Sequence, residues 1–63
     1  MKVRDLKDIL CGTVDVISES LDEELAVACS PACIVAAFAD ERVVDMRADF
    51  NPEFGATLVL RIA

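Results

Sequence analysis

Two cysteines are the first residues whose spacing suggests chemistry. Cys29 and Cys33 have three residues between them in CSPAC, and Cys11 stands apart. A structural zinc site usually has four Cys or His ligands, whereas this chain has three cysteines and no histidine. A thioredoxin-type motif places two residues between its cysteines. We therefore predict that Cys29 and Cys33 are small buried hydrophobic residues, with a thiol pair that oxidises or a metal site as the alternatives.

Nucleophilic and acid-base catalysis lack a candidate set of residues. The Ser and Thr hydroxyl groups have no histidine to act as a base, and the chain contains no glycine-rich phosphate loop. A pair of catalytic carboxylates would need a pocket that raises the pKa of one of them, and 63 residues leave little room for such a pocket. We predict that the protein is not an enzyme and that it binds no cofactor or metal ion.

The densest group of charges is the acidic run Asp22, Glu23 and Glu24. It lacks the spaced ligands and the central glycine of a calcium loop. The run is either a solvated turn or a patch that meets Arg or Lys of a basic protein. Further carboxylates are expected to project outward from strands, at Asp15, Asp45 and Asp49. A row of carboxylates on a small sheet can imitate the phosphates of a nucleic acid.

The net charge narrows the range of partners. Twelve acidic and six basic residues give a formal charge of -6 and a pI near 4.2. Direct binding to nucleic acid or to an anionic membrane surface is disfavoured, because such sites need clustered Lys and Arg. A basic protein is the electrostatic complement, unless the charge serves only to keep the protein in solution.

The N-terminus and the cysteines predict a cytoplasmic location. The segment MKVRDLKDIL carries charges where a signal peptide needs an uninterrupted apolar stretch. The chain also lacks an apolar run of the length, about 18 residues, that a membrane span requires. An odd number of cysteines without a secretory signal is typical of reduced thiols.

The clearest structural pattern lies at residues 42–63, RVVDMRADFNPEFGATLVLRIA. Two alternating runs are joined by a connection that contains Asn, Pro and Gly, which predicts a β-hairpin. One face is apolar and is expected to pack inward, with Val44, Met46, Ala48, Leu58, Leu60 and Ile62. Val43 and Val59 are expected on the opposite face. Phe50 and Phe54 fall on the connection, where they either anchor a partner or fold back over the end of the sheet.

The rest of the chain predicts two helices and two further strands. Residues 1–11 carry apolar residues at helical spacing, and residues 13–19 and 25–29 alternate like strands. Ser30 and Pro31 form a helix start, so a short helix to residue 39 is preferred over a buried strand. We predict one α+β domain over residues 1–63, with a four-stranded sheet of two hairpins and two short helices on one face, in the order αββαββ.

The apolar content exceeds what so short a chain can bury. Hydrophobic residues make up 56% of the chain, and its mean hydropathy is +0.50. A chain of this length buries only about 60% of the surface that it exposes when unfolded. The surplus is expected on the face away from the helices, at Val43, Val59, Ala26 and Ala28. This surplus predicts a homo-oligomer or another protein partner.

The order of segments resembles a known group of proteins. MKVRDLKDIL, TVDVISES, SPACIVAAFADERVVDMRAD and TLVLRIA, in this order, resemble the small uncharacterised helix-and-hairpin proteins carried by phages and mobile elements of bacteria. The resemblance implies a compact α+β fold and an interaction role without catalytic residues. Lys2 departs from the group, which often has a capping Thr at this point. Some small acidic phage proteins, anti-CRISPR inhibitors among them, block nucleic-acid-binding enzymes.

Three functions follow from these observations. The preferred one is a non-catalytic protein–protein interaction module that associates with itself. The alternatives are an acidic inhibitor that blocks a basic nucleic-acid-binding groove and a thiol switch through Cys29 and Cys33. The candidate partner-binding residues are Asp22, Glu23, Glu24, Phe50, Phe54, Val43 and Val59.

Overall fold

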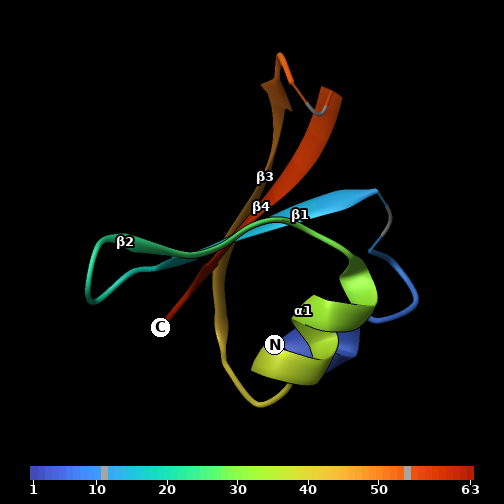
Figure 1. The fold of residues 1–63 in the computed structure, drawn as a ribbon. Coiled ribbons are helices and arrows are strands. Elements are labelled where there is room, and N and C mark those ends of the chain that lie inside the picture. Colours follow the sequence, from blue (N-terminus) through green and yellow to red (C-terminus); the bar gives the residue numbers. More distant parts are fainter. Residues whose placement is uncertain (11, 54) are drawn as a thin grey trace.

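The computed structural model describes residues 1–10, 12–53 and 55–63. Its elements are a 3-10 helix η1 (Val3–Leu6), strands β1 (Thr13–Ser18) and β2 (Glu23–Cys29), helix α1 (Pro31–Phe38), and strands β3 (Val43–Asn51) and β4 (Gly55–Ile62) (Figure 1). The strands form one mixed sheet in the order β2-β1-β4-β3, in which β1 and β4 are parallel and the other neighbours are antiparallel. The predicted α+β class and four-stranded sheet are confirmed.

The prediction of a first α-helix over residues 1–11 is wrong. Only the 3-10 helix η1 forms there, and Cys11 lies outside the described residues. The N–H of Val3 donates to the carbonyl oxygen of Glu41 at 2.9 Å, and the N–H of Arg4 donates to that of Ala39 at 3.0 Å. These bonds tie the segment to the connection after α1. A 3-10 turn suffices here because it already buries Val3 and Leu6, which are three residues apart.

The second predicted helix is confirmed as α1. The Oγ atom of Ser30 accepts the N–H of Cys33 at 3.3 Å, and Pro31 occupies the first helical position. Of the eight residues of α1, only Ile34 is fully buried. The described residues thus form one α-helix and one 3-10 helix instead of two α-helices.

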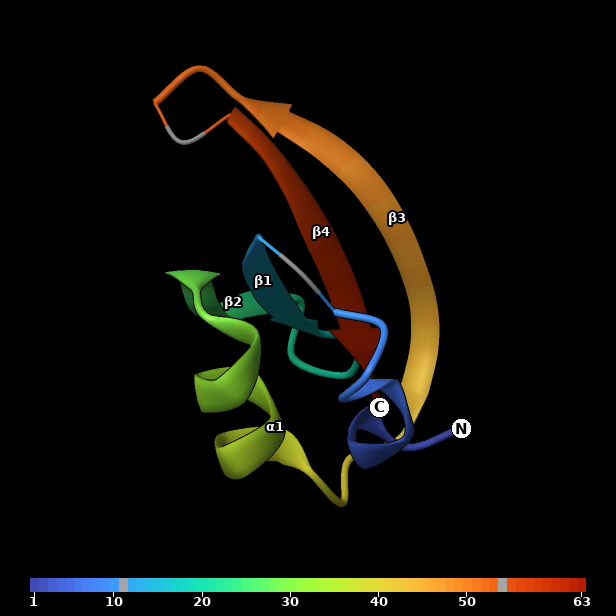
Figure 2. The same ribbon diagram turned by 90° about the vertical axis from the view of Figure 1, so that its right-hand side faces the viewer.

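The core lies between one face of the sheet and the two helices. It consists of Val3, Leu6, Leu10, Val14, Val16, Ile34, Leu60 and Ile62. Helix α1 packs on η1, β1 and β2, whereas β3 lies at the far edge of the sheet. Figure 2 shows the turn end of β3 and β4 rising well beyond α1 and η1. The helices therefore cover only part of the sheet face on which they pack.

Two irregular pairings change the predicted faces of residues. In β3 a register shift lies between Val43 and Asp45, so Val43 is opposite Ile62 and packs against the core. In β2 a register shift lies opposite Asp15, and Ala26 also packs against the core. The predicted outward positions of Val43 and Ala26 are wrong because an extra residue in a strand reverses the alternation that follows it. The inward positions of Leu60 and Ile62 are confirmed, with 0% and 2% of their surface exposed.

No helix within the described part of the chain is long and apolar enough to cross a lipid bilayer.

Candidate functional site

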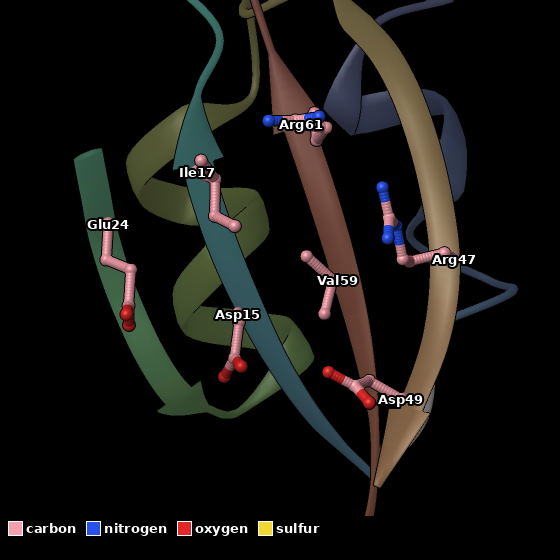
Figure 3. A pocket seen from close by; sticks show the side chains of 7 residues that line it. All are labelled: Asp15, Ile17, Glu24, Arg47, Asp49, Val59 and Arg61. Carbon is pink, nitrogen blue, oxygen red and sulfur yellow. The ribbon is translucent and has the colours of Figure 1, made fainter. Parts of the chain in front are cut away.

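The sheet face opposite the helices contains a hollow of about 300 Å³. Side chains from all four strands line it, namely Asp15, Ile17, Glu24, Arg47, Asp49, Val59 and Arg61 (Figure 3). Val59 forms part of its floor and is only 7% exposed. Its neighbours in the sheet are Asp15 on β1 and Arg47 on β3, and these longer polar side chains shield it. The prediction that Val59 presents a free apolar surface is therefore wrong.

The charged groups around the hollow have mixed signs and local partners. The Nε atom of Arg61 lies 3.3 Å from a carboxylate oxygen of Glu19. Arg47 lies 3.9 Å from Asp45, and both side chains are more than half exposed. The Oδ1 atom of Asp49 accepts the N–H of Phe50 at 2.8 Å. An exposed ion pair such as that of Arg47 with Asp45 contributes little to stability, so these two charges can exchange partners with a second molecule.

The carboxylate of Asp15 has a structural role in this hollow. Its Oδ1 atom accepts the N–H of Ala28 at 2.7 Å. Ala28 has a φ of 51°, in the left-handed region that a residue with a Cβ atom seldom adopts. It lies at the register shift of β2, where the regular ladder is interrupted. Asp15 thus satisfies a backbone donor that the irregular strand leaves without a ladder partner.

Replacement of this carboxylate tests its role. We expect Asp15→Ala to lower the free energy of unfolding by about 1–3 kcal/mol, because the Ala28 N–H loses its acceptor in a partly buried place. Asp15→Asn keeps an oxygen acceptor and should lose clearly less. Urea unfolding of the three proteins at one concentration measures the difference. Equal losses in the two variants would show that the Ala28 bond is not the cause.

The acidic run does not form one patch. Glu23 and Glu24 begin β2, opposite Ser18 and Ile17, and adjacent strand residues point to opposite faces of a sheet. Glu24 accordingly lines the hollow, whereas Asp22 lies in the turn before the strand with a φ of 52°. All three residues are exposed. The structure therefore distributes these charges over two faces and a turn.

The connection of the second hairpin is shorter than predicted. Strand β3 continues to Asn51 and β4 begins at Gly55, so Phe50 belongs to the strand and stands opposite Ala56. Its side chain is 71% exposed. Phe54, the other predicted anchor, lies outside the described residues.

Apolar side chains gather on the part of the helix-bearing face that α1 leaves open. A groove of about 300 Å³ is lined there by Ile9, Met46, Ala48, Ala56, Thr57 and Leu58. Phe50 alternates with Met46 and Ala48 along β3 and so shares their face. We call the six residues Ile9, Met46, Ala48, Phe50, Ala56 and Leu58 the apolar strip. Ile9 and Met46 are 66% and 42% exposed, so the strip is open to a partner.

Sequence reasoning placed Met46, Ala48 and Leu58 beneath helices and so missed the apolar strip. The inward position is confirmed for Leu58, which packs against the core, whereas Met46 and Ala48 are exposed. The lengths of the elements contained a signal that could have found it. An eight-residue helix such as α1 spans about 12 Å, whereas a nine-residue strand such as β3 spans about 30 Å. One short helix cannot cover such a hairpin from end to end.

The cysteines hold separate positions. Cys29 is partly buried and packs against the core, whereas Cys33 is exposed on α1; both are free thiols. The prediction that both are buried is therefore wrong for Cys33. Among residues 1–10, 12–53 and 55–63, the structure brings no three Cys, Asp or Glu side chains together in a way that could hold a metal ion.

Comparison of the chain with protein-family models, curated proteins and solved structures finds no match.

Proposed function

We propose that this protein is a non-catalytic interaction module that associates with a second copy of itself. The observation that carries the proposal is the apolar strip, which stands open on a sheet face whose other half is packed by helices. Burial of apolar surface is the main favourable term in protein association. Contiguous exposed apolar surface on a small protein is typical of an interaction site.

The position of the strip supports a protein as the partner. Phe50 stands at its outer end with most of its ring exposed, and aromatic residues provide a large share of binding energy at protein interfaces. The strip contains no charged side chain, whereas the chain as a whole carries a net charge of -6. A nucleic acid would meet neither clustered Lys and Arg nor a positive field. A second copy offers the same apolar surface in return.

Two other functions remain hypotheses. An inhibitor of a basic nucleic-acid-binding groove would use the exposed carboxylates of Asp22, Glu23 and Glu24, and its binding would weaken steeply with salt. A thiol switch would join Cys29 and Cys33, and intact mass under mild oxidant would show a loss of two hydrogens. We place the protein in the reducing cytoplasm, where its thiols stay reduced.

Sedimentation equilibrium tests self-association. We expect an average mass that rises with concentration from 6.8 kDa toward twice that value. Phe50→Ser should weaken association by at least about tenfold, which corresponds to about 1.4 kcal/mol. Its matched control is Leu21→Ser, because Leu21 is 66% exposed but lies on the β1–β2 turn.

Two results would contradict self-association through the apolar strip. A parent protein that stays at 6.8 kDa throughout the concentration range contradicts self-association. Equal weakening by Leu21→Ser and Phe50→Ser would mean that the apolar strip has no special part in it. Urea unfolding of both variants confirms that each retains its fold.

A further inference from the structure

Strand β3 has a free edge along most of its length. Among the described strands its one neighbour is β4, at the end of the sheet, and every residue from 44 to 50 is exposed. Natural edge strands are usually protected by proline, lysine or a covering segment. Residues 43–51 contain neither proline nor lysine. Such an edge offers unpaired backbone groups to another strand.

The start of this edge is already occupied. The N–H of Val43 donates to the carbonyl oxygen of Met1 at 2.8 Å, and Lys2 forms an isolated antiparallel bridge with Arg42. The N-terminal segment therefore covers β3 at its first residues. The open part of the edge lies beyond Val43, toward the turn.

We infer that this open edge pairs antiparallel with β3 of a second copy, with Ala48 opposite Ala48, so that two four-stranded sheets become one continuous sheet. The inference rests on the proposed self-association and names its surface and register. A two-fold axis perpendicular to the sheet places each residue opposite one that points to the same face. In each possible register, therefore, one residue of β3 lies at the two-fold axis and faces the same residue of the second copy. We call this residue the centre of the register.

Two of these registers place like charges opposite each other and are excluded. With Arg47 at the axis, the two Arg47 side chains face each other, and each Asp45 faces an Asp49. With Asp49 at the axis, two carboxylates face each other. Like charges directly opposite each other destabilise a strand pair.

A register centred on Met46 is excluded because the N-terminal segment already occupies part of the edge that it would use. It would place Arg47 opposite Asp45, which is favourable, but, because of the register shift between Val43 and Asp45, it would also place Val43 opposite Ala48. The edge at Val43 is already bonded to Met1. The second copy's strand would have to displace the N-terminal segment to pair there.

A register centred on Ala48 avoids like charges opposite each other and leaves the N-terminal segment in place. Arg47 then faces the second copy's Asp49, and Asp49 faces its Arg47, on the face that contains the hollow. Met46 and Phe50 face each other in the same reciprocal way on the helix-bearing face. Opposite charges and aromatic contacts across strands are the pairs that stabilise a sheet. The pairing stays clear of Met1. The N–H of Phe50, which donates to Oδ1 of Asp49 at 2.8 Å, exchanges this acceptor for the second copy's strand, and the Asp49 carboxylate turns to the second copy's Arg47.

This register also brings the apolar strips of the two copies side by side. Because Met46 and Phe50 of each copy meet at the new strand junction, the two strips join into one apolar surface across the dimer. The existing contact of Arg47 with Asp45, at 3.9 Å and well exposed, is weak enough to yield to a facing carboxylate. The edge pairing thus uses backbone groups, charges and apolar side chains together.

Cysteine cross-linking tests the register. In a background with the three native cysteines replaced by serine, Ala48→Cys places two thiols opposite each other. Opposite residues of antiparallel strands have Cα atoms about 4.5–5.5 Å apart, which suits a disulfide. Under mild oxidation we expect a species of twice 6.8 kDa that dithiothreitol returns to the monomer mass.

The controls are Met46→Cys and Arg47→Cys in the same background. In the inferred dimer the two copies of residue 46 are four positions apart along the strands, about 13 Å, which exceeds the reach of a disulfide. We expect neither control to form a covalent dimer under the same oxidation. Efficient cross-linking of Arg47→Cys, or equal cross-linking of all three variants, overturns the register.

A charge exchange gives a second, independent test. Arg47→Asp places a carboxylate opposite Asp49 and should weaken association at least about tenfold. Arg47→Asp combined with Asp49→Arg reverses both charges and should recover most of that loss. A double variant no better than the single one contradicts the pairing. A parent that dimerises while Ala48→Cys stays uncross-linked overturns only the edge pairing, whereas a monomeric parent also overturns the proposed function.

Discussion

Leu60→Ala is expected to lower the free energy of unfolding by about 2–5 kcal/mol, the range for a truncated core leucine. Leu60 has 0% of its surface exposed and lies on the central strand β4, between β1 and β3. Its neighbours across the strands are Val16 and Met46. Loss of three carbon atoms there leaves a cavity that the paired strands cannot close by moving. Urea unfolding at a fixed protein concentration measures the loss, because association would otherwise shift the result.

Two control variants make this result specific. Leu60→Met conserves most of the volume and should cost less than about 1.5 kcal/mol, so it remains folded even if the alanine variant does not. Val59→Ala, on the opposite face, removes two shielded carbon atoms and should cost about 1–2 kcal/mol. A larger loss from Val59→Ala than from Leu60→Ala would show that the main core lies on the face with the hollow.

Ile34→Ala is expected to have an effect of similar size, about 2–5 kcal/mol. Ile34 is 1% exposed and is the one fully buried residue of α1. A helix of eight residues is not stable alone in water, so α1 depends on this contact with the sheet. Because a chain of 63 residues has a total stability of only about 3–9 kcal/mol, the loss should be visible as a large fall in the urea midpoint.

The neighbouring exposed residue provides the control. Cys33→Ala changes a side chain of similar size on the solvent side of the same helix and should change the free energy of unfolding by less than about 0.5 kcal/mol. Circular dichroism at low urea concentration would show whether α1 unfolds before the sheet in Ile34→Ala. Equal effects of the two substitutions would contradict the packing of α1 through Ile34.

Local sequence patterns predicted much of the secondary structure. The alternation at residues 42–63 predicted the β3–β4 hairpin and the inward positions of Leu60 and Ile62, which the structure confirms. Ser30 and Pro31 predicted the start of α1, and the Ser30 side chain caps it as expected. These signals arise between residues a few positions apart, so they can be read without knowledge of the rest of the fold.

The candidate site was less predictable. Val43 and Val59 were expected to offer apolar surface, but one packs on the core and the other lies beneath charged side chains. Asp22, Glu23 and Glu24 were expected to act together, but the start of β2 at Glu23 separates them. Of the predicted partner-binding residues that the structure describes, Phe50 alone belongs to the apolar strip.

The sequence by itself determined which segments alternate, where α1 begins and that apolar surface would be left over. Only the tertiary structure decided where that surface lies. A register shift in β3 turned Val43 inward, bonds from Val3 and Arg4 to the connection after α1 kept the first segment short, and α1 was placed over β1 and β2. Each of these outcomes depends on contacts between residues far apart in the chain. Such contacts form only when the strands have taken their order, and this order leaves Met46, Ala48 and Phe50 uncovered at the edge of the sheet.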